Sequence, residues 1–161
     1  MRMGEGVEWA LHSCLNLAWA QDGGAVTVAR LAAYHDLPAA YLNKQLQALS
    51  RAGIVTSVPG PRGGFRLARR PEDVTLMDVV TAIEGPEQAF RCTEIRQQGP
   101  HGEMPGNSRR PCAISAAMRR AELAWRRELA ARTLADVMSE AERGAPGVPG
   151  RVRGWFATAS A

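Results

Sequence analysis

The sequence predicts a mainly α-helical fold with one small β-hairpin. Apolar residues recur at helical spacing over most of the chain, and a β-branched run at 54–58 is followed by a turn rich in Gly and Pro. Two Thr-x-x-Asp capping boxes, at Thr75 and Thr133, mark helix starts. The chain has 161 residues, 45% of them hydrophobic, which suffices for one domain with an appendage and a buried core.

The N-terminal half predicts three helices and then the hairpin. The helices are expected over 6–20, 28–34 and 39–51, with Thr27 as the N-cap of the second and Gly53 ending the third. The strands of the hairpin are expected at 54–58 and 65–67, joined by a Pro- and Gly-rich turn. Two helices joined by a tight turn and followed by such a hairpin are the order of a winged helix-turn-helix domain.

The C-terminal half predicts further helices around a polar loop. One helix runs from Thr75 through Ile83, and a short one starts at Thr133 and ends near 141. Between them, a long helix over 113–131 follows a polar loop over 92–111. The long helix carries one apolar stripe, consisting of Ile114, Met118, Ala121 and Trp125. The segment 144–161 begins with Pro and Gly, and we expect it to be loosely packed.

Composition excludes several classes of protein. The net charge of +4 is compatible with nucleic-acid binding without being diagnostic of it. No stretch approaches the roughly 18 apolar residues of a membrane span, and no signal-peptide pattern is seen, so a cytoplasmic protein is expected. No nucleophile–base constellation, P-loop or dinucleotide fingerprint is present, which argues against an enzyme. Three cysteines argue against a disulfide framework and towards metal, redox or core roles.

The helix over 39–51 is the candidate DNA-reading helix, because an α-helix fits the major groove and reads base edges with its outer face. Leu42 and Leu46 are expected to face inwards, and the polar residues around them outwards. An arginine at the hairpin tip suits insertion into the minor groove. A small helical core with a solvated hairpin is the alternative. The candidate DNA-contacting residues are Thr27, Ala39, Ala40, Tyr41, Asn43, Lys44, Gln45, Gly60, Arg62 and Gly63.

The run over 28–85 resembles the Rrf2 family of bacterial winged-helix transcription regulators. The resemblance extends through FRCTEIRQQGP at 90–100, PCAISAAMRRAELAWRR at 111–127 and TLADV at 133–137. It implies a homodimer formed by the long helix, binding a double-stranded DNA operator with two-fold-related half-sites, most simply as a repressor. It further implies four regions: a DNA-binding domain over 1–85, a cluster-binding loop over 86–112, a dimerisation region over 113–143 and a tail over 144–161.

Many family members hold an iron–sulfur cluster with three closely spaced loop cysteines, and this chain departs from that pattern. Its loop has only Cys92 and Cys112. A 2Fe–2S cluster needs four protein ligands, and histidine can replace cysteine. Glu8 and His12 are four residues apart on the first helix, so their side chains share one face. Resemblance to a redox-sensing member of the family assigns Cys92 and Cys112 from one subunit and Glu8 and His12 from the other.

Other assignments stay open at this point. Cys14 is the main competing ligand, although we expect it to be a core residue, and His35 and His101 are weaker competitors. Trp9, between the two helix ligands, is either a redox transmitter or simple packing. The alternative functions are a nitric-oxide-sensing iron–sulfur repressor and a cluster-free regulator that responds to thiol oxidation or a small molecule. The same four ligands could also hold zinc.

Overall fold

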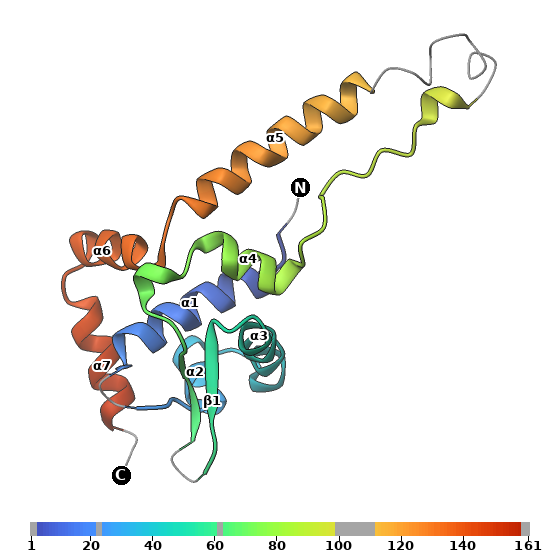
Figure 1. Ribbon diagram of the computed structural model, residues 1–161. Coiled ribbons are helices and arrows are strands. Elements are labelled where there is room, and N and C mark those ends of the chain that lie inside the picture. Colours follow the sequence, from blue (N-terminus) through green and yellow to red (C-terminus); the bar gives the residue numbers. More distant parts are fainter. Residues whose placement is uncertain (1–2, 22–23, 61–62, 99–111, 159–161) are drawn as a thin grey trace. The chain divides into compact units, whose positions relative to one another are not determined.

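The computed structural model describes residues 3–21, 24–60, 63–98 and 112–158, and it confirms a mainly α-helical fold with a two-stranded hairpin (Figure 1). The chain forms two compact units, residues 87–128 and the remainder, and each is described by itself. None of the described helices is both long and apolar enough to cross a membrane. The elements are α1 (Glu5–Trp19), α2 (Val28–His35), α3 (Ala39–Arg51), β1 (Val55–Val58), β2 (Gly64–Leu67), η2 (Pro71–Asp73), α4 (Leu76–Glu84), η3 (Ile95–Gln97), α5 (Ala113–Ala130), α6 (Leu134–Gly144) and α7 (Val148–Thr158).

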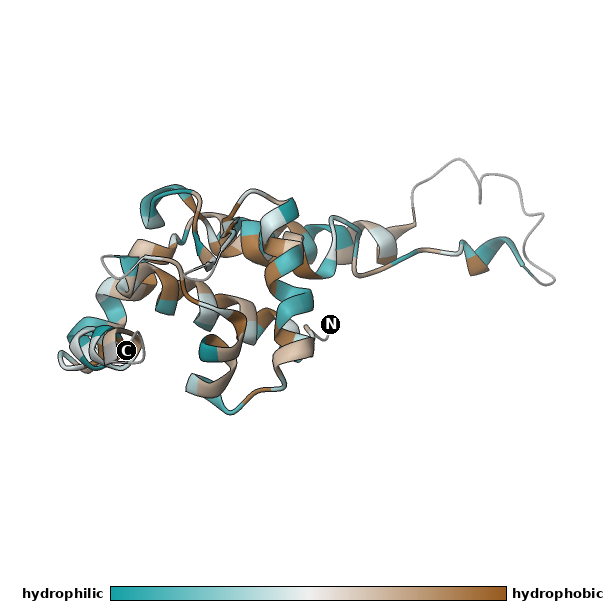
Figure 2. Ribbon diagram, turned by 90° about the horizontal axis from the view of Figure 1, so that it is seen from below, coloured by the Kyte–Doolittle hydropathy of each residue, from teal (hydrophilic) through white to brown (hydrophobic). Residues whose placement is uncertain are grey.

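Helix α1 is the centre of the larger unit. It contacts α3, α4, α6, α7 and β2, and Figure 1 shows α4 on one side of it with α2 and α3 on the other. Ala10, Cys14 and Leu17 of α1 are at most 2% exposed and belong to one continuous core. The helices carry both hydrophobic and hydrophilic residues, as amphipathic helices around a single core do (Figure 2).

The helix-turn-helix has the predicted order. Thr27 caps α2, its side chain accepting a hydrogen bond from the backbone N–H of Arg30 at 3.3 Å. Asp36, in the left-handed region at φ 52°, ends α2, and α3 begins directly after Pro38. Leu42, Leu46 and Leu49 of α3 are completely buried, so the apolar stripe of this helix fixes its inner face.

The hairpin is tied to the helix-turn-helix through its backbone. β1 pairs antiparallel with β2, with Val55 opposite Leu67. Val26 and Phe65 exchange both backbone hydrogen bonds, at 2.8 and 2.7 Å. This approach requires Gly64, because its φ is +149° and an added Cβ would lie 2.3 Å from the Val26 carbonyl oxygen.

The structure confirms both predicted capping boxes. At Thr75 and at Thr133 the hydroxyl accepts a hydrogen bond from the backbone N–H of the aspartate three residues later. The aspartate, Asp78 or Asp136, accepts one in return from the N-cap backbone. The two caps also meet, because the residues beside Thr75 and Thr133 share backbone hydrogen bonds at 2.8 and 2.9 Å. They therefore join the starts of α4 and α6.

The expectation that 144–161 is loosely packed is wrong. Residues Val148–Thr158 form α7, in which Val152 is 1% exposed and Phe156 6% exposed. Val148, Val152 and Phe156 recur every four residues and line one face. The glycines and prolines of this segment lower its intrinsic helix propensity, and packing against the core compensates for that loss.

The smaller unit contains α5 and the segment that precedes it. Along the predicted apolar stripe of α5, Ile114 is 67% exposed and Met118 43%, while Trp125 is half-buried. Glu122 is buried and accepts a hydrogen bond from Arg126 at 2.9 Å. Arg126 also donates to the backbone carbonyl of Glu87 at 2.8 Å, which holds the start of the loop against α5.

We predict that Thr75→Ala lowers the free energy of unfolding by about 1 kcal/mol, because the first turn of α4 loses its side-chain cap. Urea denaturation followed by circular dichroism measures this change. Ser139→Ala, at an exposed position of α6, is the control and should stay within about 0.5 kcal/mol of wild type. Equal stability of the Thr75 variant and the control would contradict the role of the cap.

Candidate functional site

Helix α3 presents an exposed face opposite its buried leucines. Tyr41 is 47% exposed, and Ala39, Ala40, Asn43 and Lys44 are also exposed. Ala39 and Ala40 at the start of α3 are small and leave room for close approach to another molecule. The amide of Asn43 and the ammonium of Lys44 follow within about one turn. This face has the size and chemistry that base-edge and phosphate recognition require.

Gln45 departs from the prediction that it faces outwards. It is 6% exposed, and an added Cβ at Gly6 of α1 would lie 2.9 Å from its side-chain carbon. Gln45 follows Leu42 by three residues and precedes Leu49 by four, so it lies on the buried stripe of α3. Its side chain packs where α1 and α3 approach each other, and it is not available to read a base.

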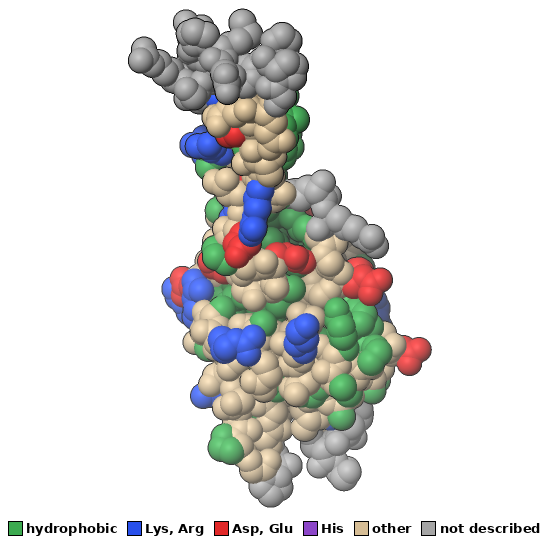
Figure 3. Space-filling model, turned by 90° about the vertical axis from the view of Figure 1, so that its right-hand side faces the viewer, with side chains coloured by type: hydrophobic (Ala, Val, Ile, Leu, Met, Phe, Trp, Pro, Cys, Tyr) green, Lys and Arg blue, Asp and Glu red, His purple; other side chains and the backbone are tan. Residues whose placement is uncertain are grey.

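The hairpin tip is described only in part. Gly60 is exposed with φ +103°, and Gly63 is buried, where an added Cβ would lie 2.2 Å from the Val58 carbonyl oxygen. The third predicted residue of the tip, Arg62, lies outside the described residues. Figure 3 faces the side on which α3 lies in Figure 1, and it shows basic side chains on a largely uncharged area of the larger unit.

Trp9 connects α1 directly to the exposed face of α3. Its ring meets that of Tyr41 edge to face, with centroids 5.1 Å apart and an interplanar angle of 74°. Trp9 is half-buried and Tyr41 is exposed. Any change in the position of the Trp9 ring therefore reaches a residue on the proposed reading face.

Glu8 and His12 are exposed and lie one turn apart on one face of α1, on either side of Trp9 in sequence. A largely apolar pocket of about 500 Å³ lies beside them, lined among others by Leu11 and Leu134. A smaller pocket of about 170 Å³ brings both residues together with His35. The two candidate ligands therefore face open space.

His35 is occupied by other contacts. Its Nε2 is 2.7 Å from Nδ2 of the buried Asn16, and its ring lies 5.5 Å from that of His12. Partial burial and the neighbouring His12 hold the pKa of His35 below its ordinary value. A neutral imidazole that accepts a hydrogen bond from Asn16 is a structural link between α1 and α2.

The structure brings together the two loop cysteines. Cys112 directly precedes α5, and its thiol hydrogen-bonds with the side chain of Cys92. Backbone N–H groups of Ser115, and next of Ile114, lower the pKa of Cys112, with a further contribution from Arg96, while burial opposes them. A helix N-terminus of this kind favours a thiolate, which is the form that binds metals.

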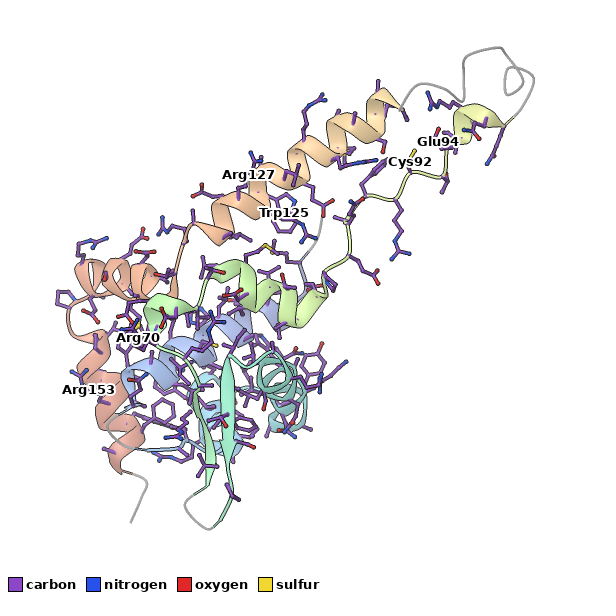
Figure 4. The ribbon with its side chains drawn as sticks, in the orientation of Figure 1. Arg70, Cys92, Glu94, Trp125, Arg127 and Arg153 are labelled. Carbon is purple, nitrogen blue, oxygen red and sulfur yellow. The ribbon has the colours of Figure 1, made fainter. Side chains whose placement is uncertain are left out.

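Sequence reasoning missed two charged residues beside these cysteines. The Cys92 thiol donates a hydrogen bond to Oε1 of Glu94 at 3.6 Å, and Figure 4 shows the two side chains side by side. Arg96 donates from Nε to Oε2 of Glu94 at 2.7 Å. Glu94 has a left-handed backbone at φ 51° and Arg96 lies in η3, so the group depends on a local turn that the residue spacing alone does not indicate.

Cys14 has a different environment from the loop cysteines. It is completely buried in the core, and burial raises the pKa of its thiol to about 12. A thiol in such a place stays protonated and does not bind a metal. The third competing ligand, His101, lies outside the described residues.

The four predicted ligands form two pairs. Glu8 and His12 belong to the larger unit and Cys92 and Cys112 to the smaller one. Among the described residues, no group of three or more His, Cys, Asp or Glu side chains of one chain could hold a metal ion. Each pair supplies two donors, so neither completes a four-ligand site by itself.

The fold and the exposed α3 define a winged helix-turn-helix protein of the class that binds DNA. The sequence matches the Rrf2 family, described as iron-dependent transcriptional regulators, over residues 3–140, and the chain belongs to this family. The family is one of transcriptional regulators and not of enzymes.

Relatives with related sequences include several regulators. The protein rrf2 of Nitratidesulfovibrio vulgaris is 31% identical over 127 residues, which cover 79% of this chain and 80% of that protein. The regulator IscR of Aliivibrio salmonicida is 30% identical over 84 residues, 52% of this chain and 50% of IscR. A relative from Aquifex aeolicus, named as an HTH-type transcriptional regulator, is 40% identical over 74 residues, 46% of this chain. The chain spans 51% of the length of that relative.

Solved structures show the same fold. IscR of T. potens superimposes with a TM-score of 0.68 at 21% identity, covering 90% of this chain and 91% of IscR. CymR, the global cysteine regulator of B. subtilis, gives a TM-score of 0.66 at 23% identity, covering 87% of this chain and 98% of CymR.

We predict that Cys112 of the reduced, metal-free protein reacts with iodoacetamide with an apparent pKa below the ordinary thiol value of about 8.5. Its lowered pKa raises the thiolate fraction near neutral pH. Cys14 should stay unlabelled in the folded protein, and mass spectrometry of peptides labelled between pH 6 and 10 measures both rates. In urea the two cysteines should react alike. Labelling of Cys14 as fast as Cys112 in the folded chain would contradict these environments.

Proposed function

We propose that the chain is a dimeric DNA-binding transcription regulator that inserts α3 into the major groove. The observation that carries this proposal is the division of α3 into a fully buried leucine stripe and an exposed face with Tyr41, Asn43 and Lys44. Asn43 suits adenine and Lys44 suits phosphate or guanine. Thr27, at the start of α2, and Gly60, Arg62 and Gly63 of the hairpin are the remaining positions that we propose contact DNA.

A homodimer would place two copies of α3 on a two-fold-related operator. Ile114, Met118 and Leu123 of α5 are apolar and exposed. They support this assignment, because exposed apolar surface on a helix is typical of a protein–protein interface. We propose that a second copy of the chain covers these residues, because an operator with two half-sites requires two DNA-binding domains. The proposed regions are DNA binding over 1–85, the ligand loop over 86–112 and dimerisation over 113–143, and such a regulator acts in the cytoplasm.

We predict that Asn43→Ala weakens binding to DNA selected by the wild-type protein by about 1–3 kcal/mol and relaxes specificity at one base pair. Lys44→Ala should instead reduce the slope of log binding constant against log salt concentration by about one, because one phosphate contact is lost. Fluorescence anisotropy at several salt concentrations measures both effects, with Ser139→Ala as a neutral control. Unchanged affinity in both variants would contradict the reading role of α3.

We further propose that the dimer holds a 2Fe–2S cluster with Cys92 and Cys112 of one copy and Glu8 and His12 of the other. The donor set fits such a group. Cys112, at the N-terminus of α5, hydrogen-bonds with the side chain of Cys92, and Glu8 and His12 are exposed one turn apart. Each pair lacks two ligands, and a second copy of the chain supplies them. The bound group would supply one-electron redox chemistry.

We propose that Trp9 couples the cluster site to DNA binding. It lies between the two helix ligands in sequence and contacts Tyr41 on the reading face. A change in ligand position on α1 would shift the Trp9 ring and with it Tyr41. Coupling free energies between sites are typically about 1–3 kcal/mol, enough to separate a repressing state from an inactive one.

A thiol-responsive regulator without a cluster is the second candidate. The specific observation that favours it is the contact between Cys92 and Cys112 together with the lowered pKa of Cys112. Adjacent thiols of this kind can be oxidised to a disulfide by a thiol oxidant. A solved structure of Staphylococcus aureus CymR in its oxidized form has the same fold, at 22% identity and a TM-score of 0.64.

We predict that protein purified without oxygen is coloured and contains iron and acid-labile sulfide, and that dithionite bleaches it reversibly. Cys92→Ser and His12→Ala should remove or alter the visible spectrum, whereas Cys14→Ala should leave it unchanged, because Cys14 is buried away from the site. Metal analysis with absorption spectroscopy measures these outcomes. A colourless wild-type protein would favour the thiol-responsive candidate, and one that contains zinc would identify a different metal at these ligands.

We also predict that oxidised and dithionite-reduced wild-type protein differ in DNA affinity by about five- to 150-fold, and that Trp9→Ala reduces this ratio. Anisotropy titrations in an anaerobic chamber at fixed salt measure the ratio. Tyr34→Phe, which keeps the ring and lies outside the Trp9–Tyr41 pair, is the matched control. Equal affinities of the two wild-type states would reject redox sensing and leave DNA binding intact.

A further inference from the structure

We infer that helix α7 is a brace that holds α2 in position for DNA binding. This inference rests on the DNA-binding function proposed above. α7 spans Val148–Thr158, beyond the residues 3–140 that match the family. It is part of the core all the same, because Val152 is 1% exposed and Phe156 6% exposed.

The first turn of α2 is held by Arg30. Its Nη2 donates a hydrogen bond to the backbone carbonyl of Trp155 at 2.9 Å. Its guanidinium carbon also lies 5.5 Å from the ring centroids of both Trp155 and Phe156. Because the backbone N–H of Arg30 donates to the Thr27 hydroxyl, the same residue joins the N-cap of α2 to α7.

The last turn of α2 is held by Tyr34. Its ring meets that of Trp155 edge to face at 5.1 Å, and it lies 5.3 Å from the ring of Phe156. Trp155 and Phe156 thus contact α2 near its beginning and near its end. Helix α1, which precedes α2, is held by α6, because the Trp19 side chain donates a hydrogen bond to Glu142 at 3.1 Å.

These contacts matter because α2 is short. A helix of eight residues is not stable alone in water, so packing must fix its position. Leu31 and Ala32 of α2 are buried in the core, and α7 adds contacts to Arg30 and Tyr34, which lie towards the two ends of α2. α2 in turn packs against α3, which also contacts α1 and α4, so α7 would act on the reading helix through α2.

The geometry also distinguishes a brace from a direct DNA contact. Nη2 of Arg30 donates to the Trp155 carbonyl and the guanidinium lies beside two aromatic rings, so we assign Arg30 to the brace and not to phosphate binding. Arg153 of α7, labelled in Figure 4, is exposed. A brace acts on DNA affinity without changing the number of phosphate contacts, and this can be measured.

The test uses the full-length protein and a DNA fragment that the wild type selects from a random-sequence library. Trp155→Ala should raise Kd about tenfold, which corresponds to about 1.4 kcal/mol, while Trp155→Phe keeps a ring and should stay within a factor of about three. Arg153→Ala, on the same helix, is the matched control and should bind as wild type does. For all three variants the slope of log Kd against log salt should equal that of the wild type.

Two further measurements separate positioning from a general loss of structure. Circular dichroism at the temperature of the binding experiment should show each variant fully folded, since Trp155 is 38% exposed and its removal leaves Val152 and Phe156 in the core. Hydrogen exchange should then be faster at α2 amides in Trp155→Ala and unchanged in α4, which α7 does not brace.

Wild-type affinity in Trp155→Ala would overturn the brace while leaving the proposed DNA binding intact. A reduced salt slope in Trp155→Ala or Arg153→Ala would overturn it in favour of a direct phosphate contact, and tighter binding in Trp155→Ala would show an inhibitory helix instead. If the wild type selects no DNA, the proposed function itself fails and the inference fails with it.

Discussion

The burial of Leu42, Leu46 and Leu49 determines which side of α3 faces solvent, and the rest of the larger unit depends on it. Because these leucines pack into the core that α1 centres, α1 and α3 approach closely where Gly6 lies opposite the end of the Gln45 side chain. The same approach brings Trp9 against Tyr41. The helix that carries the candidate ligands Glu8 and His12 is therefore packed directly on the helix that is proposed to read DNA.

The cysteines of this chain show how environment, and not residue type, separates the proposed ligands from a cysteine of the core. Cys112 lies at a helix N-terminus, where backbone N–H groups stabilise a thiolate, and Cys92 hydrogen-bonds to it. Cys14 lies in the core, where burial raises its thiol pKa to about 12. The two loop thiols can thus serve a cluster or a disulfide, but both roles need something that one chain does not supply: a second ligand pair, or an oxidant.

Much of the local structure was predictable because its causes are local. The capping boxes at Thr75 and Thr133, the N-cap Thr27 and the apolar periodicity of α3 identified helices whose bounds agree within a few residues. The failures have tertiary causes. Gln45 is polar, but Gly6 gives it a place inside, and α7 contains two glycines and a proline yet is stabilised by packing around Arg30. The group of Glu94 and Arg96 beside Cys92 depends on the path of the loop backbone, which composition does not specify.

The pairing of Val26 with Phe65 fixes the β1–β2 hairpin to the start of α2, so that the two move together. Since β2 is bonded to the residue directly before the N-cap, the hairpin cannot swing independently of the helix-turn-helix. Each subunit would then contact a duplex through α3 and through the hairpin, at a fixed distance from each other. In the proposed dimer, adaptation to operators with different half-site spacing would therefore come from rotation of whole subunits, and selectivity for that spacing would be a property of the dimer.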